Sequence, residues 1–174
     1  MEWIKTIVEV IALLFAGFQI FLLARQIKNT REWNKTNSTF EEIEKLKSCI
    51  EQVNPDLIET IGLLKSDSAP VTRETYDSLM KDSQNAKDLY LITYFYESFS
   101  VAVLCGRINE NIAKRLLYVN LTRAYYKLKP YINLRSETVG TNIVLCQHFK
   151  QLSDRWESNN PHYSHGDFKD KKDK

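Results

Sequence analysis

Arg155 and His162 are the residues whose types and spacing best suit a chemical reaction. A histidine can exchange a proton with a ribose hydroxyl and with a leaving group, and a guanidinium can hold the charge of a phosphate. The two residues therefore suggest metal-independent cleavage of RNA. The spacing also fits an arginine at a helix C-terminus followed by a histidine in a polar tail. In a chain of this composition, chance alone is expected to produce such an arginine–histidine spacing about 0.4 times.

The rest of the sequence offers no motif for a cofactor or a metal. Cys49, Cys105 and Cys146 are far apart and have neither a disulfide framework nor the C-x-x-C spacing of a zinc site. We expect three buried free thiols in a reducing compartment. No glycine-rich phosphate loop is present, and a net charge of +2 requires no basic face for DNA.

An almost unbroken apolar segment, Ile7 to Ala24, lies near the N-terminus. Its 18 residues just reach the length that an α-helix needs to cross a hydrocarbon core of about 30 Å. The Ala24-Arg25-Gln26 sequence is a poor signal-peptidase site, and a buried core helix would be shorter and less uniformly apolar. We therefore expect residues 1–28 to be an uncleaved transmembrane anchor, with Trp3 at the membrane interface.

The charges that flank the apolar segment predict its orientation. Lys5 precedes it together with Glu2, whereas a group of four basic residues follows it. These four residues are Arg25, Lys28, Arg31 and Lys35. Because an excess of basic residues marks the cytoplasmic side of a span, we expect the N-terminus outside and the body in the cytoplasm.

The polar and small residues of this segment fall on one stripe with alternating spacings of three and four, as in a heptad repeat. The stripe consists of Glu2, Lys5, Glu9, Ala12, Ala16, Gln19, Leu23 and Gln26. Such a face lets helices pack closely or lines water between them. An ionisable residue such as Glu9 inside a span should face a partner or a cavity. The alternative is that Glu9 extends from the membrane edge to the headgroups.

The body is expected to be all-α, because 5 glycines and 4 prolines are too few for the turns of a many-stranded sheet. Residues 29–38 are a linker or a helical stalk, residues 39–157 the helical domain, and residues 158–174 a disordered polar tail. Ser38 and Glu41 resemble a capping box that starts a helix. Apolar periodicity and turn residues predict helices up to residue 53 and over 56–65, 73–104, 110–128 and 137–156.

An aromatic cluster lies within the longest of these helices. It comprises Tyr90, Tyr94, Phe95, Tyr96 and Phe99. Aromatic rings can stack on nucleic-acid bases, but the surrounding run is apolar on nearly every face and no basic residues interleave it. We therefore expect these rings to pack in the core.

A short anchor, a basic flank, a small helical body and a late Arg155–His162 pair resemble the small HEPN-like membrane accessory proteins of type VI-B CRISPR systems. Residues 94–116, YFYESFSVAVLCGRINENIAKRL, also resemble a wider group of uncharacterised one-span bacterial proteins. The resemblance implies a HEPN-like bundle anchored in the bacterial inner membrane. It also implies antiviral defence beside an RNA-guided, RNA-targeting effector, through a homo-oligomeric membrane pore.

Three functional hypotheses follow. In the first, the chain self-assembles through the face of Glu2, Lys5, Glu9, Ala12, Ala16 and Gln19 and depolarises the membrane when the effector or its RNA products activate it. In the second, Arg155 and His162 form the catalytic pair of a membrane-tethered HEPN-type ribonuclease. In the third, the span is a passive anchor for an interaction module. None of them requires a cofactor, a metal or DNA.

Overall fold

The structure, a computed structural model, describes the backbone of residues 2–65, 71–139 and 145–158. Side chains are described within these ranges except at positions 2, 4, 5, 8, 10, 12 and 139. Every regular element in this part of the chain is a helix, and the elements run α1 to α6. The prediction of an all-α chain is confirmed.

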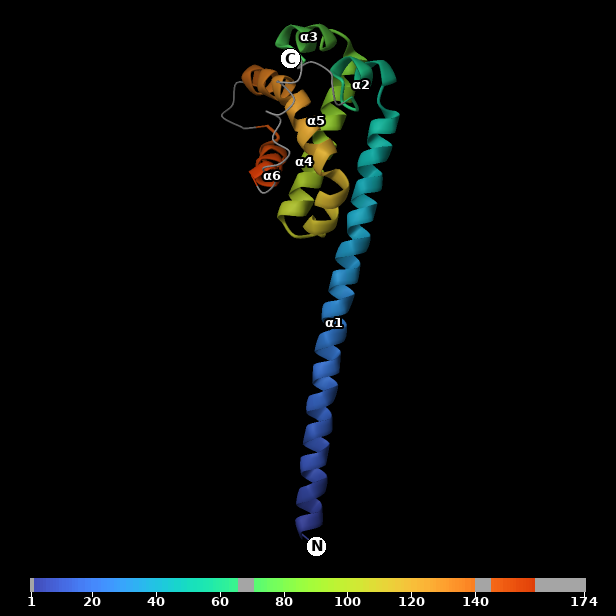
Figure 1. Cartoon of the computed structure of the whole chain (residues 1–174), viewed down its shortest axis with the longest axis vertical. Coiled ribbons are helices and arrows are strands. Elements are labelled where there is room, and N and C mark those ends of the chain that lie inside the picture. Colours follow the sequence, from blue (N-terminus) through green and yellow to red (C-terminus); the bar gives the residue numbers. More distant parts are fainter. Residues whose placement is uncertain (1, 66–70, 140–144, 159–174) are drawn as a thin grey trace, which may run out of the picture.

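Helix α1 is continuous from Glu2 to Gln52 and extends far beyond the rest of the molecule, which packs only against its C-terminal part (Figure 1). Residues 29–38 therefore belong to one uninterrupted helix, and the prediction that Ser38 starts a new helix was wrong. The threonines on either side of Ser38 lie inside this helix. The Thr36 and Thr39 hydroxyls donate to the carbonyls of Glu32 and Lys35, one turn earlier in the same helix.

Two short helices, α2 and α3, connect α1 to the longer helices of the body. Helix α2, Pro55–Ile61, begins with Asn54 as its cap and ends at Gly62, whose φ of 63° is left-handed. It is shorter than the predicted 56–65 because this glycine terminates it. Helix α3, Arg73–Leu79, begins at Thr72, whose hydroxyl accepts from the Thr75 amide, as expected from the sequence.

Helix α4, Ser83–Leu104, is separate from α3, so the prediction of a single helix over 73–104 was wrong. Asp82 explains the break. Its Oδ1 accepts from the amides of Gln84 and Asn85, at 2.7 and 3.1 Å, and so caps a new helix. After α4, Gly106 takes a φ of 70°, as expected of a residue that closes a helix.

Helix α5, Glu110–Val139, continues through Pro130, although the sequence predicted its end near residue 128. Proline has no amide hydrogen and disturbs the preceding turn. In this turn the buried hydroxyl of Tyr76 donates to the Lys127 carbonyl at 2.9 Å. The ring of Tyr76 also lies 5.7 Å from that of Tyr131. Contacts from α3 therefore support α5 on both sides of the proline.

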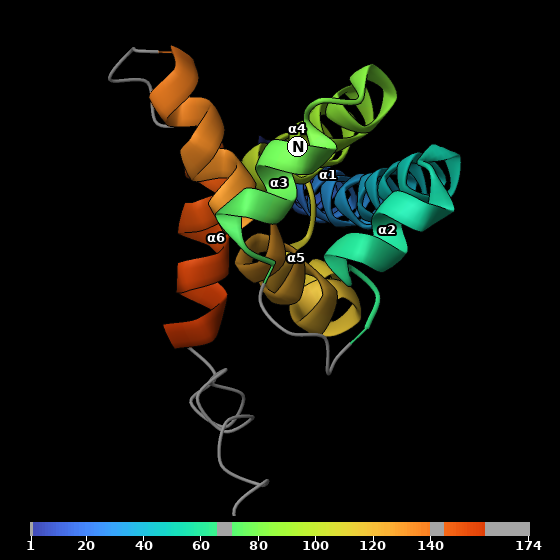
Figure 2. The same ribbon diagram turned by 90° about the horizontal axis from the view of Figure 1, so that it is seen from above.

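Helix α6, Gln147–Ser158, starts ten residues later than the predicted start at residue 137, because Glu137 still belongs to α5. Seen from above, α6 and α1 lie on opposite sides of the α4–α5 pair (Figure 2). The largest fully buried side chains are Trp156, Tyr76, Phe99 and Phe149. The core therefore lies between α4, α5 and α6, and α1 covers one side of it.

The aromatic cluster on α4 is divided between core and surface. Tyr96 and Phe99 are buried, and Tyr96 stacks on Phe149 at 4.9 Å, as expected of core residues. Tyr90 and Tyr94 are exposed and stack on each other at 6.3 Å, so the prediction that all five rings pack in the core was wrong for this pair. Both side chains are more than half exposed, on a side of α4 that the described part of the chain leaves largely uncovered.

Candidate functional site

The part of α1 that projects beyond the body is the most unusual surface of the molecule. Every described side chain between Trp3 and Lys35 is exposed to solvent. At about 1.5 Å per residue, this part of the helix is about 50 Å long. Large apolar side chains on all of its sides are exposed by 45–73%, among them Leu13, Leu14, Phe15, Phe18, Ile20, Phe21, Leu22 and Leu23. A helix that is apolar all round is normally buried in protein or lipid.

A second finding concerns the length of this apolar surface. Among the side chains that the structure describes, no helix carries an apolar stretch long enough to cross a membrane. The predicted span, residues 7–24, includes Val8, Val10 and Ala12, whose side chains lie outside the described part.

The stripe predicted to join helices lies on this projecting part. Glu9, Ala16 and Gln19 are exposed and, by helical periodicity, share one face of α1. The side chains of Glu2, Lys5 and Ala12, which belong to the same prediction, lie outside the described part. Self-association through this face stays a prediction.

The body is attached to α1 by a polar junction that the sequence did not reveal. The hydroxyl of Thr39, which is fully buried, accepts from the backbone amide of Asn109 at 2.8 Å. One turn further along α1, Glu42 pairs with Arg107 at 2.8 Å. Asn109 also caps α5, since its Oδ1 accepts from the Asn111 amide. The junction thus ties the start of α5 to α1, across about 70 residues of sequence that no local pattern connects.

Arg155, the predicted catalytic arginine, has a structural partner. Its guanidinium pairs with Glu110 at 2.9 Å, and the indole of the neighbouring Trp156 donates to the same carboxylate at 3.1 Å. Glu110 is the first residue of α5, so the contact fastens the end of α6 to the start of α5. His162 lies outside the described residues. The structure therefore does not test whether Arg155 and His162 lie close together.

Glu97, His148 and Cys146 form a second group of reactive side chain types, at the start of α6. Glu97 accepts from the backbone amides of His148 and Phe149, at 3.2 and 2.8 Å, and from the His148 ring at 2.7 Å. It is therefore the cap of α6, supplied by another helix. Burial and, secondly, the Glu97 charge raise the pKa of the Cys146 thiol to about 12, which makes it a poor nucleophile.

The three cysteines do not share one environment. Cys49 is buried, and burial followed by the charge of Asp88 raises its pKa to about 11. Cys146 is half-buried and Cys105 is exposed. The expectation of three buried thiols was therefore wrong for Cys105, which closes the C-terminus of α4. All three are free in the structure, and no cluster of histidine, cysteine or carboxylate suited to a metal occurs in its described part.

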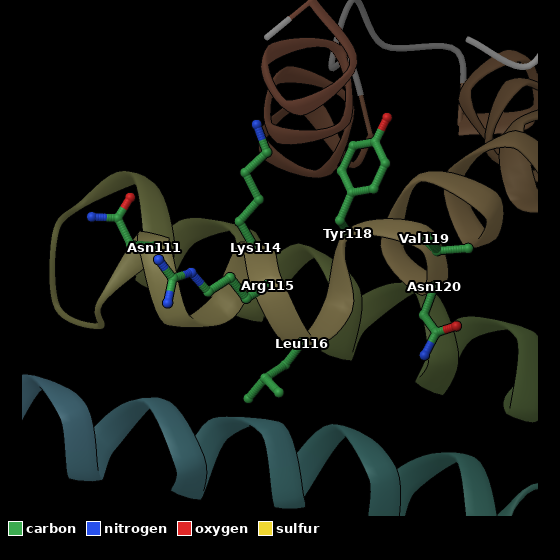
Figure 3. Close-up of a pocket in the computed structure, with 7 residues that line it drawn as sticks. All are labelled: Asn111, Lys114, Arg115, Leu116, Tyr118, Val119 and Asn120. Atoms are coloured by element: carbon green, nitrogen blue, oxygen red, sulfur yellow. The ribbon is translucent and has the colours of Figure 1, made fainter. Parts of the chain in front are cut away.

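A shallow pocket of about 450 Å³ lies along α5 (Figure 3). The side chains of Lys114 and Tyr118 point to one side of this helix, whereas Leu116 points to the other side, toward α1 (Figure 3). The Lys114 ammonium lies 5.8 Å from the centre of the Tyr118 ring. The lining residues diverge around the helix and do not converge on a common point, so this pocket has no ligand-binding geometry.

Comparison with known proteins identifies a family but no activity. Residues 6–156 match the family described as Domain of unknown function (DUF4760). The chain belongs to this family. No curated protein and no solved structure matches this DUF4760 protein. The matched region covers the apolar segment, α1 from residue 6 onward, α2 to α5 and most of α6, so it includes nearly all of the projecting helix.

Proposed function

We propose that this DUF4760 protein is anchored in a membrane by the N-terminal part of α1 and assembles with copies of itself there. The observation that carries the proposal is the apolar surface around the projecting helix, whose large side chains are exposed on all sides. Soluble monomers rarely leave a contiguous apolar surface of this size in water. A lipid bilayer would cover all sides of the helix at once.

The dimensions and charges of α1 support the anchor. Residues 7–24 form about 27 Å of helix, close to the ~30 Å of a hydrocarbon core. The helix then continues without a break through Arg25, Lys28 and Arg31 to the body. Basic residues on this flank favour an inner-membrane protein whose N-terminus lies outside and whose body lies in the cytoplasm.

Self-assembly is the second part of the proposal. A span that carries Glu9 and Gln19 on one face would gain by turning this face to another span, because polar side chains are more stable in a helix–helix interface than against hydrocarbon. Several copies arranged in this way would line a polar path through the membrane. We propose that such a pore depolarises the membrane during antiviral defence, when an RNA-guided RNA-targeting effector or its RNA products activate it. This context follows from the resemblance to type VI-B accessory proteins, to which the family match adds nothing.

The anchor is tested with the thiol that the body itself offers. Cys105 is exposed, so a membrane-impermeant maleimide should label it in inside-out vesicles and not in intact spheroplasts. Cys105→Ser is the control for labelling at Cys49 and Cys146. Labelling in intact spheroplasts would place the body on the other side. Release of the protein from membranes by alkaline carbonate would refute the anchor.

The assembly is tested by native mass spectrometry of the full chain released from detergent. We expect one closed oligomer of six or more copies if a pore forms. The double variant Glu9→Leu, Gln19→Leu should fall apart into smaller species, whereas Leu13→Ile, Leu22→Ile on other faces should not. A wild-type monomer or dimer would refute the pore. A chain in which an unrelated span replaces residues 7–24 tests whether this segment is more than an anchor. If this chain still depolarises the membrane fully, residues 7–24 act only as a passive anchor.

The ribonuclease hypothesis stays a prediction. Arg155 already pairs with Glu110, and this contact gives the guanidinium a role in joining α5 to α6. Catalysis by the pair predicts that the purified chain cleaves RNA without metal and that His162→Ala abolishes cleavage. Arg155→Lys, which keeps the charge near Glu110, separates loss of catalysis from loss of the helix contact.

A further inference from the structure

Two large aromatic side chains lie exposed on α1 beyond the apolar segment, Trp33 before the body and Phe40 at its near edge. Trp33 is 65% exposed and Phe40 is 50% exposed. They are seven residues apart, so they lie on one face of the helix, about 20° from exact alignment. Phe40 stands at helical spacing with a series of apolar residues further along α1, namely Ile43, Leu46, Ile50 and Val53. The structure buries Leu46 and Val53 of this face and leaves Phe40 outside.

The body does not cover these rings because it packs on the other side of α1. Thr39 and Cys49 mark the covered side, since both are buried. At about 100° per residue, Thr39 is rotated by about 160° from Asn37, which lies between the two aromatic rings and is exposed. Glu44, one turn beyond Phe40, is exposed as well. The aromatic face thus points away from the body.

The membrane cannot cover these rings either. If the hydrocarbon core ends near Ala24, Trp33 lies about 13 Å and Phe40 about 24 Å further along the helix axis. The headgroup layer on each side of a bilayer is only about 5–8 Å thick. Both rings therefore lie beyond the headgroups, in water, in the stretch of α1 that leads to the body.

The aromatic face also continues the stripe of the span. From Gln19 onward, positions with alternating spacings of four and three are Leu23, Gln26, Thr30, Trp33, Asn37, Phe40 and Glu44. This is the heptad spacing with which two parallel helices pack along their whole length. One continuous face therefore runs from the membrane to the level of the body, and its two largest apolar residues lie in the aqueous part.

We propose that neighbouring copies of this chain in the assembly pack in parallel and in register along this face, so that adjacent helices stay in contact above the membrane through Trp33 and Phe40. The proposal rests on the proposed function, because insertion in the same membrane makes neighbouring helices parallel and places the same residue of each helix at the same height. Since the body lies on the opposite side of α1, the bodies would sit outside the helix assembly and not between the helices.

Cysteine cross-linking in native membranes tests this pairing. In the Cys105→Ser background, Asn37→Cys places a thiol between the two rings, and Lys35→Cys places one on the opposite face, two residues away. Both positions are exposed. Oxidation with copper phenanthroline should join Asn37→Cys chains into dimers several-fold more efficiently than Lys35→Cys chains, because like positions of an in-register pair lie within disulfide distance. Equal yields would refute the pairing.

Two further variants separate this proposal from the proposed function. Leu23→Cys, on the same stripe but not at one of its polar residues, reports contact between the spans, so cross-linking there without cross-linking at Asn37→Cys would refute the aqueous pairing and leave the membrane assembly standing. Failure at both positions would refute both. Adding Trp33→Ala and Phe40→Ala should abolish the Asn37→Cys dimer. Adding Tyr90→Ala, which removes an aromatic ring that is 59% exposed elsewhere, should leave the dimer unchanged.

Discussion

Replacing Thr39 with valine should loosen the attachment of the body to the projecting helix. Thr39 is fully buried on α1, and its hydroxyl accepts from the amide of Asn109 at 2.8 Å while donating to the Lys35 carbonyl at 2.6 Å. Valine has nearly the same shape, so it leaves no cavity. It does leave the Asn109 amide without its partner at the start of α5.

The expected loss of stability is the cost of leaving the Asn109 amide without its hydrogen-bond acceptor. A buried donor left without a partner costs about 1–3 kcal/mol, whereas the Lys35 carbonyl keeps its helical bond and loses little. We therefore expect Thr39→Val to lower the free energy of unfolding by about 2 kcal/mol. For a body of about 120 residues, this corresponds to a drop in melting temperature of about 5–10 °C.

Thr36 provides the matched control. Its hydroxyl makes the same bond to the carbonyl four residues earlier, at 2.9 Å, but the side chain is only half-buried and this exposed bond stays within α1. Thr36→Val should therefore change stability by less than about 0.5 kcal/mol. Urea unfolding of the full chain in detergent measures both variants, and the change in tryptophan fluorescence as the buried Trp156 becomes exposed follows the transition. Equal losses of stability in the two variants would refute the reasoning. Thr39→Ser keeps the hydroxyl and should therefore be more stable than Thr39→Val.

Three more predictions concern the other contacts of the body. Glu97→Gln keeps the shape of the α6 cap but removes its charge, so it should cost about 1 kcal/mol in urea unfolding. Tyr76→Phe removes the hydroxyl that supports α5 next to Pro130 and should cost about 1–2 kcal/mol in the same assay; a neutral result would mean that water replaces it. Because the pKa of Cys146 rises to about 12 in the folded chain, its contribution to stability is complete below pH 9 and is lost as the pH rises toward 12. Cys146→Ala should therefore flatten the alkaline loss of stability more than Cys105→Ala does, as measured by unfolding at pH 8 to 11.

The sequence by itself determined the all-α class and several helix ends. These features depend on local chemistry: Pro55 at the first turn of α2, Thr72 as the cap of α3 and Gly106 after α4 act within a few residues of chain. The apolar segment and its polar stripe were visible for the same reason, because helical periodicity is a property of neighbouring residues.

Only the tertiary structure decided which of several permitted local outcomes occurred. Pro130 is a valid helix end in sequence, yet α5 continues through it with Tyr76 of α3 packed beside it. A helix start at residue 137 was equally valid, but Glu97 of α4 fixes the start of α6 at residue 147. The exposure of Phe40 could not be predicted from the sequence either. Which face of a helix is covered depends on elements distant in sequence, and spacing along one helix carries no information about where these elements pack.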